Sequence, residues 1–206
     1  SSVETIGAYA FANCTGFTSI TVPKTIKTLG DYAFSDCTSL KEAEIKPVGK
    51  IGNYVFNKCI SLEEITLPYA GTTLESVNKE GSGEYIVEKL FYDNITDKTY
   101  KVYKGGFSRF VPNSLKKITI KGGTRIPSHA FEGFKMVEEF VLPDTITSIG
   151  DYAFQNCSSM PSNPMPESVK VIGNHAYDGC KALKTFVVSS SVETIGAYAF
   201  ANCTGF

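Results

Sequence analysis

The stretch IGAYAFANC, residues 6–14, decides the fold because variants of it recur along the chain at a spacing of 23 residues, once shortened to 22. Each variant has an aliphatic residue, usually followed by glycine, then an aromatic residue five positions later and, in most copies, a cysteine three positions after that. A fixed period in this range is typical of a solenoid, in which each unit stacks only on its neighbours. The copies begin at Ile6, Leu29, Ile51, Ile126, Ile149, Ile172 and Ile195.

A second pattern, placed between the copies of the first, predicts one short strand per unit. The fourth and sixth residues of each segment share one face, since side chains alternate along a strand, and in parallel stacking this face is buried. The return arm, IGxYAFxxC, is expected to form short turns or a single helical turn, and its glycine suits a turn of positive φ. The strand segments are FTSITV (17–22), LKEAEI (40–45), LEEITL (62–67), LKKITI (115–120), VEEFVL (137–142) and LKTFVV (183–188), with Ile20, Ala43, Ile65, Ile118, Phe140 and Phe186 as their buried fourth residues.

Composition narrows the class of protein. The 206 residues carry a net charge of -1, so the chain lacks the basic stripe that nucleic acid or an anionic membrane surface requires. No apolar run approaches the roughly 20 residues that span a bilayer. There is no initiator methionine or signal peptide and both ends fall inside a repeat, which indicates a piece of a longer protein.

The arm, the Leu-x-x-Ile-x-Leu-Pro strand and the 23-residue spacing together resemble the leucine-rich repeats of the BspA type, found in surface proteins of anaerobic bacteria and some mucosal protozoan parasites. The resemblance covers residues 1–73 and 114–206. It implies a single leucine-rich repeat domain over 1–206, a right-handed, horseshoe-like solenoid of about seven to eight repeats, with a parallel sheet on the concave side and short or helical turns on the convex side. It also implies a secreted or cell-surface binding or adhesion protein, and not an enzyme.

The repeat is interrupted once by an insertion. We interpret residues 74–123 as one enlarged repeat, in which KLF (89–91) replaces the Ala-Phe of the arm and residues 92–113 loop out, with a hairpin suggested by the alternation in TDKTYKVY. The aromatic and cationic residues of this loop form either a cluster that covers the flank of the solenoid or an exposed contact patch. Those selected as candidate binding residues are Tyr92, Tyr100, Tyr103, Phe107 and Arg109.

A second irregularity is MPSNPM (160–165), which occupies a strand position. Its two prolines predict a short or distorted strand, either as a local irregularity or as a deliberate kink. Met160 and Met165 still fall at the buried positions.

The cysteines and histidines follow the repeat and therefore do not indicate chemistry. All six cysteines fall in one column, which predicts free buried thiols and excludes a zinc site with four converging ligands. His129 and His175 occupy a column otherwise filled by tyrosine, and they lie two repeats apart. No catalytic motif or phosphate-binding loop is present, so we expect no enzyme activity and no cofactor or metal.

The outward face of the sheet is the remaining candidate site. Glu42, Glu44 and Glu64 form an acidic patch, while Lys116, Lys117, Lys121 and Arg125 form a basic one beside the insertion. Charges there are explained either by a solvated sheet face or by a concave surface that binds a protein or glycan. The candidate binding residues on this face are Glu42, Glu44, Glu64, Thr66, Lys117, Thr119, Glu139 and Val141.

Two functions compete on these grounds. The first is an extracellular adhesion module that recognises a host or bacterial surface protein or glycan through the concave face and the insertion. The second is a structural spacer within a tandem-repeat surface protein.

The two ends of the chain are identical. Residues 1–17 and 190–206 both read SSVETIGAYAFANCTGF, although the other arms differ from it at several positions. Either one end was copied to the other by engineering, or the chain is one period of a 189-residue super-repeat plus an overlap. The second hypothesis predicts that copies stack end to end.

Overall fold

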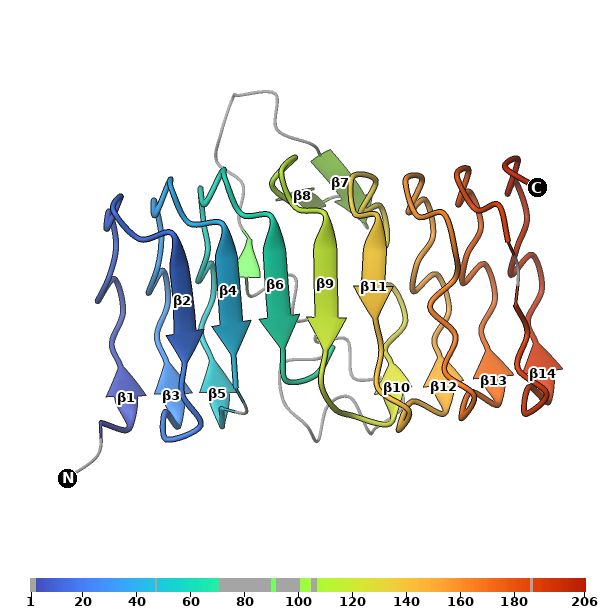
Figure 1. Cartoon of the computed structure of the whole chain (residues 1–206), viewed down its shortest axis with the longest axis horizontal. Coiled ribbons are helices and arrows are strands. Elements are labelled where there is room, and N and C mark those ends of the chain that lie inside the picture. The colour runs from blue at the N-terminus through green and yellow to red at the C-terminus, as the bar shows by residue number, and fades with distance from the viewer. Residues whose placement is uncertain (1–2, 47, 71–89, 92–100, 105–106, 186) are drawn as a thin grey trace.

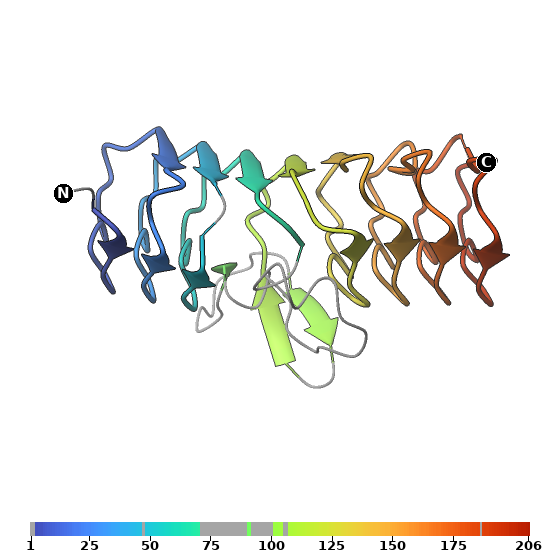
Figure 2. The same ribbon diagram turned by 90° about the horizontal axis from the view of Figure 1, so that it is seen from below.

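The chain is a parallel β-solenoid of about seven turns (Figure 1). The computed structural model describes residues 3–46, 48–70, 90–91, 101–104, 107–185 and 187–206, with the backbone alone for 101–104 and 107–110. Figure 2 shows an elongated and only slightly curved array, with one layer of longer strands along one side. The predicted leucine-rich repeat solenoid is confirmed, and its return arms are turns and not helices.

The longer strands form one continuous sheet with the predicted buried face. Neighbouring strands pair in parallel and in register, so that Ala43, Ile65 and Ile118 stack behind the sheet and are almost fully buried. We call each turn of the solenoid a coil. Ile20 is half-buried because it lies in the first coil, and Phe186 lies outside the described residues. The sheet order is β11 (Glu139–Val141), β9 (Lys117–Ile120), β6 (Glu64–Leu67), β4 (Glu42–Ile45) and β2 (Ser19–Val22).

The aliphatic residue that begins each arm lies in a second, shorter strand. These two-residue strands form two parallel sheets, which are separated at the position of the insertion. The first contains β1 (Thr5–Ile6), β3 (Thr28–Leu29) and β5 (Lys50–Ile51), and the second contains β10 (Arg125–Ile126), β12 (Ser148–Ile149), β13 (Val171–Ile172) and β14 (Thr194–Ile195).

The return arm is a series of tight turns that hydrogen-bond to the next coil. The N–H groups of Tyr9, Phe11 and Asn13 donate to carbonyl oxygens of the following coil at 2.8 to 3.0 Å. The intervening N–H groups close turns inside the arm, as Ala12 does to the Tyr9 carbonyl. The turns require left-handed backbone at two positions, with φ of 56° at Tyr9 and 61° at Asn13, and this pattern repeats in every described arm.

The expected role of the arm glycine was wrong. Positive φ occurs at the tyrosine or histidine that stands two residues before the phenylalanine of the arm, and at the residue before the cysteine. It does not occur at the glycine of the Ile-Gly pair. That glycine is required because adjacent coils approach closely: a Cβ at Gly150 would lie 2.4 Å from the Ser128 nitrogen and 2.8 Å from the Pro127 carbonyl carbon. Real Cβ atoms do not make such contacts, so Gly150 admits no side chain.

The insertion leaves the long sheet intact. Strands β6 and β9 pair directly, with Glu64 opposite Lys117, although the whole insertion lies between them in sequence. The Phe56 N–H donates to the Leu90 carbonyl at 2.9 Å, so Leu90 and Phe91 occupy the Ala and Phe positions of that arm. The range assigned to the loop contains an antiparallel hairpin, β7 (Lys101–Lys104) with β8 (Phe107–Phe110). Figure 2 shows this hairpin on the side of the solenoid away from the long sheet.

The strand position with two prolines is distorted, as expected. Among the described residues, only an isolated bridge between Ser162 and Thr185 remains there. The Asn163 side chain replaces the missing backbone pairing, since its amide donates to the Val187 carbonyl at 2.8 Å and accepts from the Val187 N–H at 3.2 Å. Met160 is fully buried, whereas Met165 is only partly buried.

Candidate functional site

The described interior consists of columns of stacked rings and thiols. Phe154 stacks between Phe131 and Tyr177, with centroids 5.5 and 5.2 Å away. Every cysteine after the first coil donates its thiol to the backbone carbonyl of the aromatic residue one coil earlier, as Cys180 Sγ does to Phe154 O at 3.2 Å. All six cysteines are free, four of them buried, and no described group of His, Cys, Asp or Glu side chains has the arrangement of a metal site.

Burial makes the inner thiols poor nucleophiles. Removal from water raises the pKa of Cys59, Cys157 and Cys180 well above the ordinary thiol value, with a smaller opposing effect of backbone hydrogen bonds. Because the thiolate is the reactive species, burial disfavours reaction at these three cysteines, which donate hydrogen bonds within the column.

We expect the thiols of the native protein to react in two classes. Cys14 and Cys203, in the half-buried end coils, should react with a disulfide reagent first, and the four buried cysteines only after the coils open. Labelling of the native chain, followed by mass spectrometry of its peptides, checks this order. Rapid labelling of Cys59 or Cys157 in native buffer would contradict the burial of the column.

The two histidines belong to an aromatic ladder on the arm side. His129 and His175 stack on opposite faces of Tyr152, at 4.7 and 4.9 Å, so they replace tyrosine in the column as predicted. His175 Nδ1 also lies 3.0 Å from Asp178 Oδ2. Burial opposes ionisation of Asp178, but hydrogen bonds from Asn202, Gln155 and His175 outweigh it and lower its pKa. Neighbouring rings cover the faces of the inner rings, so these inner rings do not present flat aromatic surfaces to a ligand.

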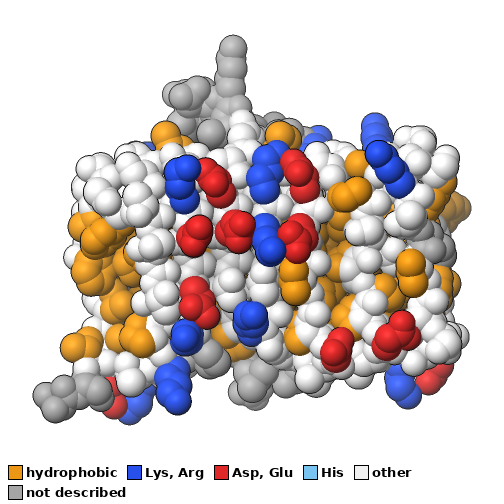
Figure 3. Space-filling view, in the orientation of Figure 1, with side chains coloured by type: hydrophobic (Ala, Val, Ile, Leu, Met, Phe, Trp, Pro, Cys, Tyr) orange, Lys and Arg blue, Asp and Glu red, His pale blue; other side chains and the backbone are white. Residues whose placement is uncertain are grey.

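The outward face of the long sheet is where unbalanced charge remains. Figure 3 views it directly and shows acidic and basic side chains gathered over its central strands. Lys41 pairs with Glu63 at 3.1 Å, Lys116 with Glu138 at 2.9 Å, and Lys117 with Glu139 at 3.2 Å. Two of the four residues of the expected basic patch, Lys116 and Lys117, therefore pair with acidic residues of the next coil, and the role of the patch stays a prediction.

Glu42 and Glu64, which we call the carboxylate pair, differ from their surroundings. They lie directly opposite one another on β4 and β6, both exposed, and form no ion pair with any described residue. Like charges in facing strand positions destabilise a sheet. Glu44, two residues along β4, has its nearest cation at 4.0 Å, at Lys46. The carboxylate pair can therefore gain from a cationic partner.

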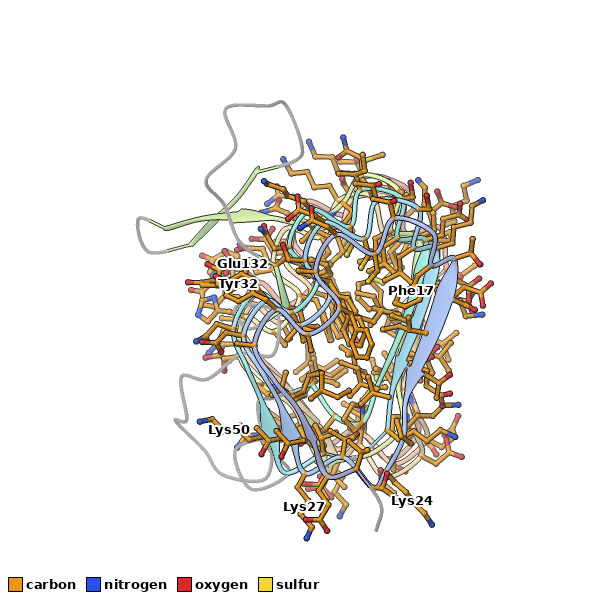
Figure 4. All side chains as sticks on the ribbon, turned by 90° about the vertical axis from the view of Figure 1, so that its left-hand side faces the viewer. Phe17, Lys24, Lys27, Tyr32, Lys50 and Glu132 are labelled. Carbon is orange, nitrogen blue, oxygen red and sulfur yellow. The ribbon has the colours of Figure 1, made fainter. Side chains whose placement is uncertain are left out.

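The other candidate residues are distributed unevenly. Thr66 is half-buried and Val141 is exposed, but Thr119 is only 9% exposed. Thr119 is therefore too buried to offer a partner much contact surface. Tyr92 and Tyr100 lie outside the described residues, and for Tyr103, Phe107 and Arg109 the backbone alone is described, so their contact role stays a prediction. Those three lie on the hairpin, away from the long face (Figures 2 and 4).

The repeat pattern of coils, arms and columns matches one known family. The family model for the BspA-type leucine-rich repeat region matches residues 1–96 and 101–206, in six copies. The chain belongs to the BspA-type leucine-rich repeat family. The family model covers more than half of the chain. A search of the curated proteins found no match to this chain.

The chain is similar, at low identity, to solved structures of bacterial leucine-rich repeat proteins. A leucine-rich repeat protein from Bacteroides ovatus is 22% identical, with a TM-score of 0.46 over 98% of this BspA-type chain and 69% of its own. A leucine rich cell surface protein from Faecalibacterium prausnitzii is 26% identical, with a TM-score of 0.46 over 89% of this chain and 42% of its own. The Treponema pallidum leucine-rich repeat protein is 20% identical, with a TM-score of 0.41 over 98% of this chain and 71% of its own.

Across the residues that the structure describes, no helix has the length and apolar character needed to cross a membrane.

Proposed function

We propose that this chain is a non-catalytic, cell-surface binding module that takes a basic segment of another protein on the outward face of the long sheet. The observation that carries the proposal is the carboxylate pair of Glu42 and Glu64, which face each other and form no ion pair with a described residue. Lys117 lies opposite Glu64 on the next strand, but its ammonium group pairs with Glu139 at 3.2 Å. An arriving Lys or Arg side chain relieves the repulsion between them, so the interaction gains electrostatic energy in a way that a neutral ligand cannot match.

The geometry of the face favours a protein over a glycan. The described outward positions carry carboxylate, hydroxyl, ammonium and aliphatic groups but no aromatic ring on which a sugar could stack. The sheet is a rigid, almost flat platform, and solenoid sheets of this kind offer extended surfaces to partners. The insertion hairpin lies on the other side of the molecule, so it does not extend this surface. The cell-surface location is proposed from the family, since a structural neighbour is described as a cell surface protein.

The test combines array screening with charge reversal. The chain is screened on arrays of host and bacterial surface proteins and on a glycan array, and each hit is measured again with the double variant Glu42→Lys/Glu64→Lys. We expect affinity for protein hits to fall about tenfold or more and to weaken with added salt. Glu193→Lys is the control, because Glu193 is also exposed but pairs with Lys170, away from the carboxylate pair. Binding unchanged in the double variant would remove the carboxylate pair from the function.

The alternative is a spacer that holds another domain away from the cell. This alternative is supported by the regular stacking of one coil on the next along the chain, which makes the chain a stiff rod. A chain that binds nothing on either array would favour the spacer.

A further inference from the structure

The hairpin of β7 and β8 belongs to the longest segment of the chain that has no acidic residue. Residues 98–131 contain eight lysines and arginines but no aspartate or glutamate. Three of these cations, Lys101, Lys104 and Arg109, fall within the two hairpin strands. The acidic residues of 74–113 all precede residue 98, so the insertion is acidic in its first part and basic in its hairpin.

The pairing of the hairpin strands places two of these cations on one face. Val102 stands opposite Arg109, and Lys104 stands opposite Phe107. Positions along a strand alternate between its faces, and opposite positions share a face, so Lys104 and Arg109 belong to the same face of the hairpin. They are diagonal neighbours in the ladder, about 7 to 8 Å apart. A partner that carries two nearby carboxylates can therefore meet both cations at once.

The carboxylate pair on the long sheet has a matching spacing. Glu42 and Glu64 occupy facing positions of adjacent parallel strands, which are roughly 4.8 Å apart. Both residues are exposed. The flexible four-carbon stem of lysine absorbs the difference between the two spacings. The hairpin cations and the carboxylate pair therefore agree in number and spacing and are opposite in sign.

The hairpin and the carboxylate pair lie on opposite sides of the molecule. The long strands form one side of the solenoid, and the hairpin stands on the other (Figures 2 and 4). The packed coils lie between them, so the two cannot meet within one chain. They can meet between two chains, and the net charge of -1 means that two copies repel one another little.

We propose that the hairpin of one copy docks on the long face of a second copy, with Lys104 and Arg109 against Glu42 and Glu64. The proposal rests on the proposed function, because it uses the same carboxylate pair, and it identifies the basic segment as one that this chain itself supplies. A docked pair still has one free hairpin and one free long face. The contact is heterologous, so further copies add front to back in an open linear assembly.

A charge swap tests the contact without changing the net charge. Lys104→Glu/Arg109→Glu should raise the concentration at which the chain self-associates by about tenfold or more, and so should Glu42→Lys/Glu64→Lys. The chain with all four substitutions has an acidic hairpin and a basic face, and its net charge is still -1. Its self-association should return to within about threefold of the unaltered chain. Sedimentation velocity over a concentration series at low salt measures all four proteins.

A second fourfold variant is the matched control. In Glu42→Lys/Glu64→Lys/Lys24→Glu/Lys50→Glu the net charge is again unchanged, but the hairpin and the face are both basic, so this variant should not self-associate. Lys24 and Lys50 are exposed and lie at the edge of the coils opposite the hairpin (Figure 4). Circular dichroism checks that each variant is folded. Self-association of the control as strong as that of the swapped chain would overturn the proposal.

The outcomes separate this contact from the proposed function. An unaltered chain that stays monomeric up to about 1 mM, or self-association that Lys104→Glu/Arg109→Glu leaves unchanged, would overturn docking between copies. Binding to array proteins that is lost in Glu42→Lys/Glu64→Lys but kept in the hairpin variant would then still support the proposed function. Weaker self-association in both double variants, with recovery in the swapped chain alone, supports the docking.

Discussion

Gly150→Ala should lower the free energy of unfolding by about 3 kcal/mol or more, because the new methyl group has no space between two coils. Its Cβ would lie within 2.8 Å of three backbone atoms of residues 127–128, and backbone cannot move aside as a flexible side chain can. The coils on either side must separate, and each coil is stabilised mainly by its neighbours. Chemical denaturation followed by circular dichroism measures the loss.

Gly7→Ala is the matched control for this effect. It makes the same change at the equivalent position of the first arm, where nothing lies within 4 Å and no positive φ is involved. We expect its stability to differ from that of the unaltered chain by less than about 0.5 kcal/mol. If the two variants were equally destabilised, the cause would be the backbone propensity of glycine and not the close approach of coils.

Phe154→Ala should cost about 3 to 5 kcal/mol, the second large effect. The ring is fully buried, stacks between Phe131 and Tyr177, and meets the edge of Phe140 at 5.0 Å. Its removal leaves a cavity in the middle of the array and breaks three ring contacts at once. The free energy of unfolding, determined from denaturant curves, is again the measurement.

Phe11→Ala tests the same column at its open end. Phe11 is 36% exposed and stacks on one ring of the next coil, Phe34, at 5.2 Å. We expect a cost of about 1 to 2 kcal/mol, since less apolar surface leaves water in the folded state. If Phe11→Ala and Phe154→Ala lowered the free energy of unfolding equally, the number of neighbouring rings in the column would not determine how much each ring stabilises the fold.

Periodicity determined most of the architecture. The spacing of the arm motif places Cys180 one coil after Cys157, and the alternation in the strand segments places Ile65 and Ile118 behind the sheet. These predictions succeed because in a solenoid a fixed sequence period maps each position to one column. The same mapping identified the histidines as members of a tyrosine column, so their ring stacking required no further information.

The candidate site depended on details that a period does not contain. The sequence indicated a basic patch that included Lys116 and Lys117, but each cation lies within 3.3 Å of an acidic residue of the adjacent coil. Such pairing depends on how long side chains orient across strands, and spacing alone does not specify it. The carboxylate pair became visible only when the compensated charges around it were assigned to partners.

By itself, the sequence determined the repeat, the family resemblance, the buried columns and the identity of the two ends, because each is a property of position along the chain. The tertiary structure alone decided why the arm glycine is required, which side carries the insertion hairpin and which charges on the long face are unpaired. These features depend on distances of a few ångströms between coils, and such distances are set when the coils pack together. The same packing leaves Gly7 without a neighbour, although its sequence context is that of Gly196.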